Sequence, residues 1–254
     1  MKITYKTIKN TKQIDKPNED IVFCDLDKKI FILLDGVSRD NINGKYPNPS
    51  PAAEVANILK NEIYKNLLLI DEKNDNILNA IFTSLKNANN EVRLYNESAN
   101  LQFASGAVGI VAMIDKEMFY YAYIGDCYGR LIYKDKSITF TECQTKKISQ
   151  HKKEYTSYEI REIICNNIEH PYAYGVLNGD ERACQFIVLD KINLSKVKQI
   201  ILSSDGMEDF LSKCSVNLLK SNNAVELLER AIVDNNEKQD DRTIIKIELE
   251  EGNG

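Results

Sequence analysis

The chain has 254 residues, with 33 basic and 38 acidic side chains, a net charge of -5 and 43% hydrophobic residues. This composition is ordinary for a soluble globular protein, and we expect a single domain over residues 1–254. The acidic balance gives no basic footprint for nucleic acid, and no apolar run approaches the roughly 20 residues that span a bilayer. The start, MKITYKTIKN, lacks the apolar core of a signal peptide. We therefore expect a cytoplasmic protein with no nucleic-acid or membrane partner.

The cysteines and histidines limit the chemistry further. No two of the six cysteines have the spacing of a zinc knuckle or a C-x-x-C redox pair, so we interpret them as reduced thiols. Only two histidines are present, which excludes a zinc site rich in histidine. Reactive chemistry must therefore come mainly from carboxylates. The abundance of Lys, Asn and Ile indicates an AT-rich, bacterial genome.

The first half of the chain predicts a hairpin and then two helices. Apolar residues 21–24 and 30–34 predict two strands joined by a polar turn. Ser50 can cap a helix over 51–67, with a proline at its first position and apolar residues at helical spacing. A second apolar stripe predicts a helix over about 77–96.

The second half is richer in β-strand. From Gly106 onward, GAVGIVAMI, MFYYAYIGD, GRLIY and SITF predict an antiparallel meander, and CQFIVLD, VKQIILSSD and RTIIKIEL predict three later strands. Helices are expected over 206–214 and 223–234, and residues 141–180 are predicted to form a flap or insert. Because strands and helices come in blocks, an antiparallel α+β layered fold fits better than a doubly wound parallel sheet.

Acidic residues stand at the ends of apolar segments in several places. Magnesium and manganese prefer oxygen ligands, and a glycine after an aspartate lets the backbone approach an ion closely. Taken singly, each place is equally typical of an ordinary turn, because Asp-Gly is above all a turn signal. The places are Glu19 with Asp20, Asp35 with Gly36, Asp205 with Gly206, and Asp240 with Asp241.

Several motifs in order carry a family resemblance. NEDIVF is similar to an N-E-D-x motif, FILLDGVS to an apolar-D-G motif, SPAAEVA to the helix start that follows, and YIGDCYGRLIY to a G-D-S-R strand pair. YGVLNG, ILSSDGMEDF and DDRTIIKI are similar to the later segments. From about Lys16 to Leu249, the sequence thus resembles the metal-dependent protein phosphatases of the 2C type, the PPM family, in its bacterial branch.

The resemblance implies a four-layer α/β/β/α sandwich of two antiparallel sheets flanked by helix pairs. It also implies hydrolysis of phosphoserine and phosphothreonine by a water activated at a centre of two Mn²⁺ or Mg²⁺ ions. Such ions lower the pKa of water and neutralise phosphoryl charge, so no covalent phosphoenzyme is required. The implied substrates are phosphorylated proteins, a Ser/Thr kinase is a candidate partner, and nothing in the sequence demands more than a monomer.

The resemblance assigns site residues by matched position. Asp35 would bridge both ions, Glu19 and the carbonyl of Gly36 would serve one ion, and Asp205 and Asp240 would serve the other. The implied catalytic set is Asp35, Asp205 and Asp20, of which Asp20 would hold a metal-bound water. Asp126 would support the ligands from behind.

The chain departs from the family pattern at the phosphate-binding arginine. Many relatives carry this arginine four residues before the motif glutamate, where this chain has Asp15. Lys16 lies next to it but offers only a point charge, which does not replace a planar guanidinium. Arg39 is an alternative substitute. Substrate affinity or choice depends on what takes this role.

A second departure lies in the G-D-S-R motif, which here reads Gly125, Asp126, Cys127 and Tyr128. We interpret the family arginine as structural, with Tyr128 packing in its place. The aspartate that would hold a third ion falls at Cys143. A third ion would therefore need Glu142 or another donor.

Two other interpretations remain open from the sequence. IVFCDLDKK ends a strand in D-x-D, as in haloacid-dehalogenase-type phosphatases, with Asp25 and Asp27 as nucleophile and acid; the lysines that follow argue for a plain turn. The alternative function is a catalytically silent, phosphatase-like binding or regulatory protein. The missing arginine favours this alternative, and the retained carboxylates oppose it.

Overall fold

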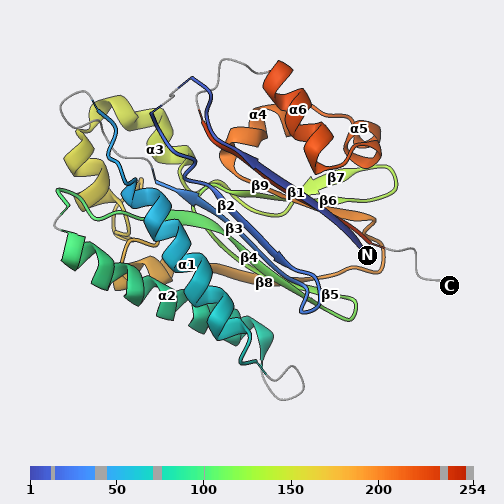
Figure 1. The fold of residues 1–254 in the computed structure, drawn as a ribbon, viewed down its shortest axis with the longest axis horizontal. Helices are drawn as coiled ribbons and strands as arrows, with labels where there is room; N and C mark the ends of the chain where they lie inside the picture. The colour runs from blue at the N-terminus through green and yellow to red at the C-terminus, as the bar shows by residue number, and fades with distance from the viewer. Residues whose placement is uncertain (13–14, 38–44, 71–75, 100, 235–239, 250–254) are drawn as a thin grey trace.

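The computed structural model describes residues 1–12, 15–37, 45–70, 76–99, 101–234 and 240–249. Two five-stranded antiparallel sheets lie face to face, and helices cover the outer face of each sheet (Figure 1). Apolar residues fill three layers: between the first helix pair and its sheet, between the two sheets, and between the second sheet and its helices. The predicted four-layer α/β/β/α sandwich is confirmed.

The two sheets draw their strands from different parts of the chain. The first sheet has the order β2-β3-β4-β5-β8, with bounds Ile21–Asp25, Ile30–Gly36, Ala107–Asp115, Met118–Ile124 and Val188–Asn193. The second has the order β1-β10-β9-β6-β7, with bounds Lys2–Ile8, Arg242–Glu248, Gln199–Ser203, Tyr128–Ile132 and Ser137–Thr139.

The helices fall into two groups and a set of short turns. α1 (Pro51–Leu67) and α2 (Ile77–Ala99) pack on the first sheet. The second sheet is covered by α4 (Glu208–Leu211), α5 (Val216–Ser221) and α6 (Ala224–Asp234). The short elements are α3 (Lys146–His151), the π-helix η2 (Glu159–Ile164), and the 3₁₀ helices η1 (Lys152–Glu154), η3 (Glu181–Phe186) and η4 (Asp205–Met207).

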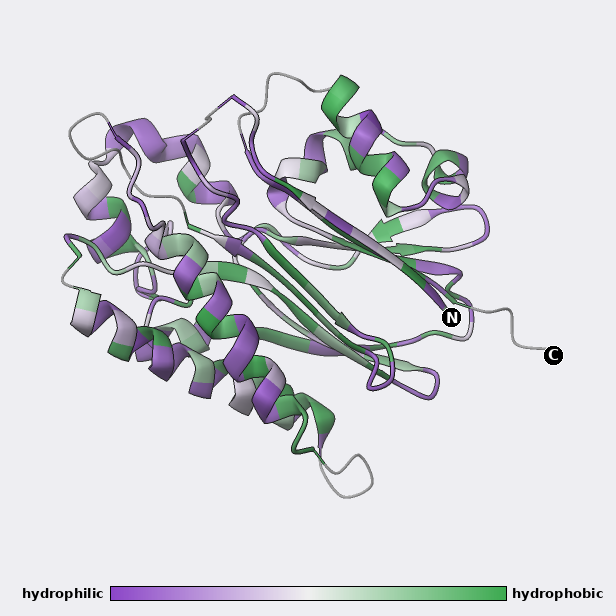
Figure 2. Ribbon diagram, in the orientation of Figure 1, coloured by the Kyte–Doolittle hydropathy of each residue, from purple (hydrophilic) through white to green (hydrophobic). Residues whose placement is uncertain are grey.

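Strand β3 shows why the sandwich has apolar layers on both sides of a sheet. Its side chains alternate, so Ile30, Ile32 and Leu34 pack in the helix-facing layer, while Phe31 and Leu33 pack between the sheets. A strand buried on both faces is apolar throughout, as IFILL in β3 is. The hydropathy colouring shows these central strands mainly green and the covering helices striped with purple (Figure 2).

The predicted start of α1 is confirmed. Ser50 has extended backbone, its hydroxyl accepts a hydrogen bond from the Ala53 amide, and Pro51 occupies the first turn. This arrangement satisfies an amide that otherwise lacks a partner at a helix start. Among the described residues, none of the helices combines the length and apolar character that a bilayer crossing requires.

Some elements differ from the sequence predictions. Strand β1 and helix α5 were not predicted. In CQFIVLD, the first residues belong to the 3₁₀ helix η3, and the strand begins only at Val188. The physical reason is Asp180, whose side chain accepts from the Arg182 amide and so starts a helical turn. The predicted helix over 206–214 is shorter, because η4 leads into α4, which ends at Leu211.

The segment predicted as a flap, residues 141–180, contains α3, η1 and η2. Figure 1 shows its yellow ribbon at the end of the sandwich where β2 begins and β3 ends. Gln144 ties this segment to the first sheet, since its amide donates to the Gly125 carbonyl at 3.0 Å and its side-chain oxygen accepts from the Gly125 amide at 2.9 Å.

Strand β10 carries a fully buried lysine, Lys246. Its ammonium donates to the carbonyls of Leu219 at 2.8 Å, Lys220 at 3.1 Å and Asn222 at 2.5 Å. These carbonyls lie at the end of α5, where a helix leaves acceptors without internal partners. Lys246 therefore holds α5 against the second sheet.

We expect Lys246→Met to lower the free energy of unfolding by at least about 2 kcal/mol, because three buried carbonyls lose their donor. Urea denaturation measures this loss. Lys213→Met, at an exposed position after α4, is the control and should stay within roughly 0.5 kcal/mol of the wild type. Equal stability of the two variants would contradict the anchoring role of Lys246.

Candidate metal centre

The register of the two sheets brings the predicted acidic residues to one end of the sandwich. Ile21 pairs with Leu34, so the start of β2 and the end of β3 lie side by side. In the second sheet, Ser203 pairs with both Tyr128 and Ile244, which aligns the end of β9 with the starts of β6 and β10. The acidic residues immediately precede or follow these positions in the chain.

Asp35 lies at the centre of the carboxylates at this end. Burial raises the pKa of Asp35 well above its usual range, and the nearby charges of four further aspartates raise it more. The structure thus brings together five of the predicted residues. We name them the acidic cluster: Asp20, Asp35, Asp126, Asp205 and Asp240.

Asp20 is the most deeply buried member of the acidic cluster among the described residues. Its side chain is 5% exposed, and within the described residues neither carboxylate oxygen has a hydrogen-bond partner. Burial raises the pKa of Asp20 to about 7; Thr243 and Ser204 lower it, while Asp241 raises it. A buried carboxylate without donors is costly unless a cation or water completes it.

Two glycines let the motif segments approach one another. A Cβ at Gly206 would lie 1.9 Å from the Asp241 carbonyl oxygen, and one at Gly36 would lie 2.9 Å from the Glu19 carbonyl oxygen. Both positions therefore require glycine. In ILSSDGMEDF, the glycine serves the contact with the segment before β10 as well as the turn into η4.

Glu19 is placed differently from the acidic cluster. Its Oε1 accepts hydrogen bonds from the hydroxyls of Tyr46, at 2.5 Å, and Ser50. Its Oε2 lies 3.1 Å from the Nζ of Lys16. The structure therefore surrounds the Glu19 carboxylate with donors from the protein itself. The resemblance implies that the Gly36 carbonyl is a backbone ligand. Gly36 packs directly against the Glu19 backbone.

Asp241 is a site residue to which the sequence analysis assigned no role. Its carboxylate accepts from the backbone amides of Asn10 at 2.7 Å and Glu19 at 2.8 Å, and it lies 3.6 Å from Lys16 Nζ. It thus joins the chain before β2 to the chain before β10. Only its position beside Asp240 could have signalled this, because its partners lie more than 200 residues away.

The neighbourhood of Asp126 shows what replaces the family's serine and third-ion aspartate. The Thr145 hydroxyl donates to Asp126 Oδ2 at 2.8 Å, and Cys143 Sγ lies 3.4 Å from the same hydroxyl. Burial, and then the charge of Asp35, raises the pKa of the Cys127 thiol, so Cys127 adds no negative charge. Glu142 is exposed and contacts Tyr123 through its backbone amide.

An arginine lies two residues beyond its expected place in the G-D-S-R motif. Arg130 is on the same face of β6 as Tyr128, and its guanidinium binds both carboxylate oxygens of Glu208. Glu208 begins α4, three residues after Asp205. This partly buried pair fixes the helix that follows the Asp205 turn. Tyr128 is half-buried.

Of the two candidate replacements for the phosphate-binding arginine, Lys16 and Arg39, the structure describes only Lys16. Lys16 is 4% exposed and faces Glu19 and Asp241 rather than solvent. Asp15, at the family's arginine position, is exposed. Arg39 lies outside the described residues.

The acidic cluster fits a hard divalent cation by its chemistry. Mg²⁺ and Mn²⁺ take oxygen ligands and keep several waters, so few protein ligands suffice. In the part of the chain that the structure describes, no three Asp, Glu, His or Cys side chains form a ready set that could hold an ion as they stand. The unsatisfied oxygens of Asp20 and the mutual repulsion around Asp35 nevertheless match a site completed by cations and water.

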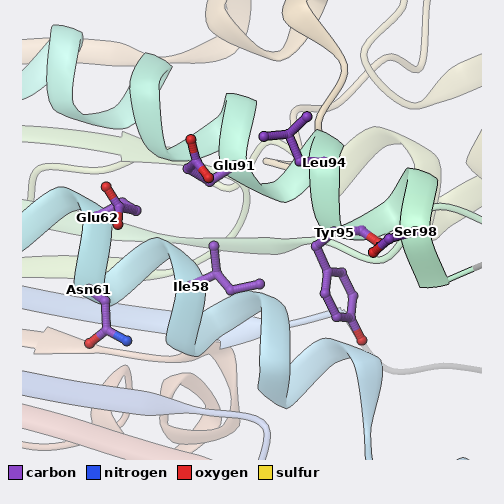
Figure 3. Close-up of a pocket in the computed structure, with 7 residues that line it drawn as sticks. All are labelled: Ile58, Asn61, Glu62, Glu91, Leu94, Tyr95 and Ser98. Carbon is purple, nitrogen blue, oxygen red and sulfur yellow. The ribbon is translucent and has the colours of Figure 1, made fainter.

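A hollow of about 420 Å³ lies elsewhere, between α1 and α2 (Figure 3). It is lined by Ile58, Asn61, Glu62, Glu91, Leu94, Tyr95 and Ser98. Figure 3 shows Ile58 and Tyr95 lying between the two helices. None of these residues belongs to the acidic cluster, so the hollow is separate from the candidate centre.

The raised pKa of Asp20, about 7 in the fold against an ordinary 3.8, predicts a pH-dependent stability without added metal. Ionised Asp20 is disfavoured by folding. Its penalty is therefore absent below about pH 4, grows as pH rises, and is complete above about pH 7. In EDTA, we expect the melting temperature to fall between pH 5 and pH 8. Asp20→Asn should flatten this fall. A wild type that melts higher at pH 8 than at pH 5 would contradict the burial of these carboxylates.

Comparison with known proteins gives an independent view of the chain. Residues 49–163 match the family model described as protein phosphatase 2C. A search of curated proteins found no match. Many solved structures share the fold.

Three bacterial structures illustrate this likeness. The serine/threonine phosphatase PstP/Ppp from Mycobacterium tuberculosis is 17% identical, with 98% of each chain covered and a TM-score of 0.72. Stp1 from Staphylococcus aureus is 17% identical, with 98% of this chain and 94% of Stp1 covered and a TM-score of 0.72. The PstP catalytic domain in complex with two manganese ions is 15% identical, with 97% of each chain covered and a TM-score of 0.70. Residues 49–163 thus match the protein phosphatase 2C family model, and nearly the full chain shares the fold of these three serine/threonine phosphatases.

Proposed function

We propose that this chain is a metal-dependent phosphoprotein phosphatase that hydrolyses phosphoserine and phosphothreonine with a water activated by two Mn²⁺ or Mg²⁺ ions. The observation that carries the proposal is the acidic cluster of five aspartates that the strand register brings to one end of the sandwich, where the other four raise the pKa of Asp35. A group of this kind repels itself and attracts divalent cations. The protein phosphatase 2C match and the shared fold support the same activity.

The residues of the chain divide the work of the reaction. When bound, the two ions would lower the pKa of water towards ~7 and neutralise phosphoryl charge. Asp35, Asp205 and Asp240 would hold the ions, with the Gly36 carbonyl beside them. Asp20 keeps buried acceptor oxygens, which suit it to orient the attacking water and receive its proton. Asp126, held by Thr145, would steady the group from behind.

The two-ion centre is supported by one structural relative. PstP with the same fold was solved in complex with two manganese ions. The acidic cluster supplies only oxygen donors, which suit manganese and magnesium alike. A third ion has little support, because Cys143 replaces the expected aspartate and contacts Thr145.

The proposal extends to partners and setting. The substrates would be phosphorylated proteins, and a Ser/Thr kinase would be the opposing enzyme. We propose a monomer acting in the cytoplasm of a bacterium, with residues 1–254 as one domain and residues 141–180 as a flap beside the acidic cluster. The hydrogen bonds from Gln144 to Gly125 and from Thr145 to Asp126 support that position of the flap.

Asp25, the nucleophile in the dehalogenase-type alternative, has a structural role in this fold. Asp25 Oδ1 accepts from the amides of Asp27 and Lys28, each at 3.0 Å, and its Oδ2 accepts from the Tyr64 hydroxyl at 2.7 Å. These bonds close the turn between β2 and β3. Asp25 therefore acts as a turn residue, and it also serves as a control for mutation of the cluster.

We expect hydrolysis of p-nitrophenyl phosphate and of a phosphothreonine peptide in manganese. EDTA should abolish turnover, and Asp205→Asn or Asp35→Asn should lower kcat/KM by about 100-fold or more, because each removes a proposed ligand. Asp25→Asn should retain turnover within a few fold.

The outcomes separate the alternatives. Loss of activity in Asp25→Asn but not in Asp35→Asn would favour the dehalogenase-type hypothesis. Manganese binding by calorimetry with no turnover on either substrate would instead identify a silent, phosphatase-like binding protein.

A further inference from the structure

Lys16 is a buried cation that the proposed mechanism does not use. Its ammonium lies 3.1 Å from Glu19 Oε2 and 3.6 Å from Asp241 Oδ2, and its side chain is 5% exposed. Both carboxylate partners are also buried, at 1% and 2% exposed. A buried lysine facing two buried carboxylates is a compact ionic group whose charges depend on one another.

This ionic group borders the acidic cluster. Asp240 in the cluster acts electrostatically on Lys16, and Asp241 acts on Asp20. The Gly36 amide donates to the Glu19 carbonyl, so Glu19 lies directly beside the Asp35-Gly36 turn. The charge of Lys16 is therefore within electrostatic reach of the carboxylates that would hold metal.

We propose that Lys16 is a built-in counter-ion that neutralises Glu19 and Asp241. At this edge of the centre, the Lys16 ammonium competes with a divalent ion for these two carboxylates. The inference rests on the proposed function and goes beyond it. It makes Lys16 a positioning residue that sets how much the fold depends on metal. With Lys16 in place, Glu19 is bound by Lys16, Tyr46 and Ser50 and acts as a structural anchor beside the metal centre; without Lys16, its carboxylate becomes open to an ion.

The chemistry of the pair supports a permanent charge on Lys16. Burial by itself lowers the pKa of Lys16, but Glu19 and Asp241 outweigh this and raise the pKa above its ordinary value. The ammonium thus stays charged at neutral pH. Its burial also keeps it from a substrate phosphate, which would have to displace Glu19 to reach it.

Thermal melting of Lys16→Met in EDTA and in manganese tests the proposal. In EDTA, we expect the melting temperature to fall on the order of 10 °C, because Glu19 and Asp241 lose their counter-ion. Manganese should recover most of this loss, since a divalent ion can take over the compensation. Manganese affinity, measured by calorimetry, should tighten on the order of tenfold, because a competing positive charge has been removed.

Lys246→Met is the matched control. Lys246 is a second buried lysine, but its partners are backbone carbonyls at the end of α5. Its loss of stability should be equal in EDTA and in manganese. The double variant Lys16→Met with Glu19→Gln should regain part of this stability in EDTA, because one of the two carboxylate charges left without a counter-ion is gone.

The results distinguish the inference from the proposed function. If manganese leaves the melting temperature of the wild type unchanged, the metal-dependent function fails first. If manganese stabilises the wild type but restores Lys16→Met no better than Lys246→Met, Lys16 is only a structural pair and the inference is wrong. A raised KM for the phosphopeptide with unchanged manganese affinity would also overturn it, because Lys16 would then act on the substrate.

Discussion

Repulsion among clustered carboxylates, which are at least half-buried, is the constraint that shapes one end of this sandwich. Asp35 is surrounded by four further aspartates, and burial adds to the cost of their charges. The chain meets part of this cost itself: Lys16 balances Glu19 and Asp241. Within the acidic cluster, Asp20 keeps two buried oxygens without a hydrogen-bond donor among the described residues. The carboxylates beside the cluster are therefore neutralised within the protein, while Asp20 is arranged for a cation or water from solution.

The layered fold makes this concentration of charge tolerable. Three apolar layers, two of them beneath helices, stabilise the sheets over their whole length. The acidic residues occupy only the strand ends, where the chain turns and backbone groups are available. Gly36 and Gly206 allow neighbouring segments to meet there without a side chain between them. The Asp241 carboxylate then fastens the first and last parts of the chain through the amides of Asn10 and Glu19. Folding energy gained in the core thus offsets the electrostatic cost at one edge.

Local patterns were sufficient to predict much of this arrangement. Alternating apolar strands, the Ser50 cap and the ends of β3 and β9 are signals within a few residues, and they located Asp20, Asp35, Asp205 and Asp240 beside strand ends, whereas Asp126 was assigned only by the family resemblance. Strand β1 was not predicted, because it is a half-exposed edge strand that contains threonine and lysine. Helix η3 was not predicted, because the Asp180 cap starts a helical turn in a segment whose apolar residues predicted a strand. The burial of Lys16 depends on Asp241, more than 200 residues away, so no local pattern signals it. Arg130 was missed for a similar reason, because its partner Glu208 lies on another element.

The departures from the family motifs share one physical consequence. Three buried cations lie at this end of the fold in the described residues: Lys16 and Arg130 are paired with carboxylates of the protein, and Arg242 lies within electrostatic reach of Asp240. The ammonium of Lys16 and the guanidinium of Arg130 face these carboxylates rather than an incoming phosphate. Because a phosphate monoester dianion needs positive charge to be approached by a nucleophile, the compensation in the proposed reaction falls on the bound ions themselves. A phosphatase built in this way would hold its substrate mainly through metal, and its choice among phosphoproteins would have to come from the surface around the cluster, where residues 141–180 adjoin Asp126 through Thr145.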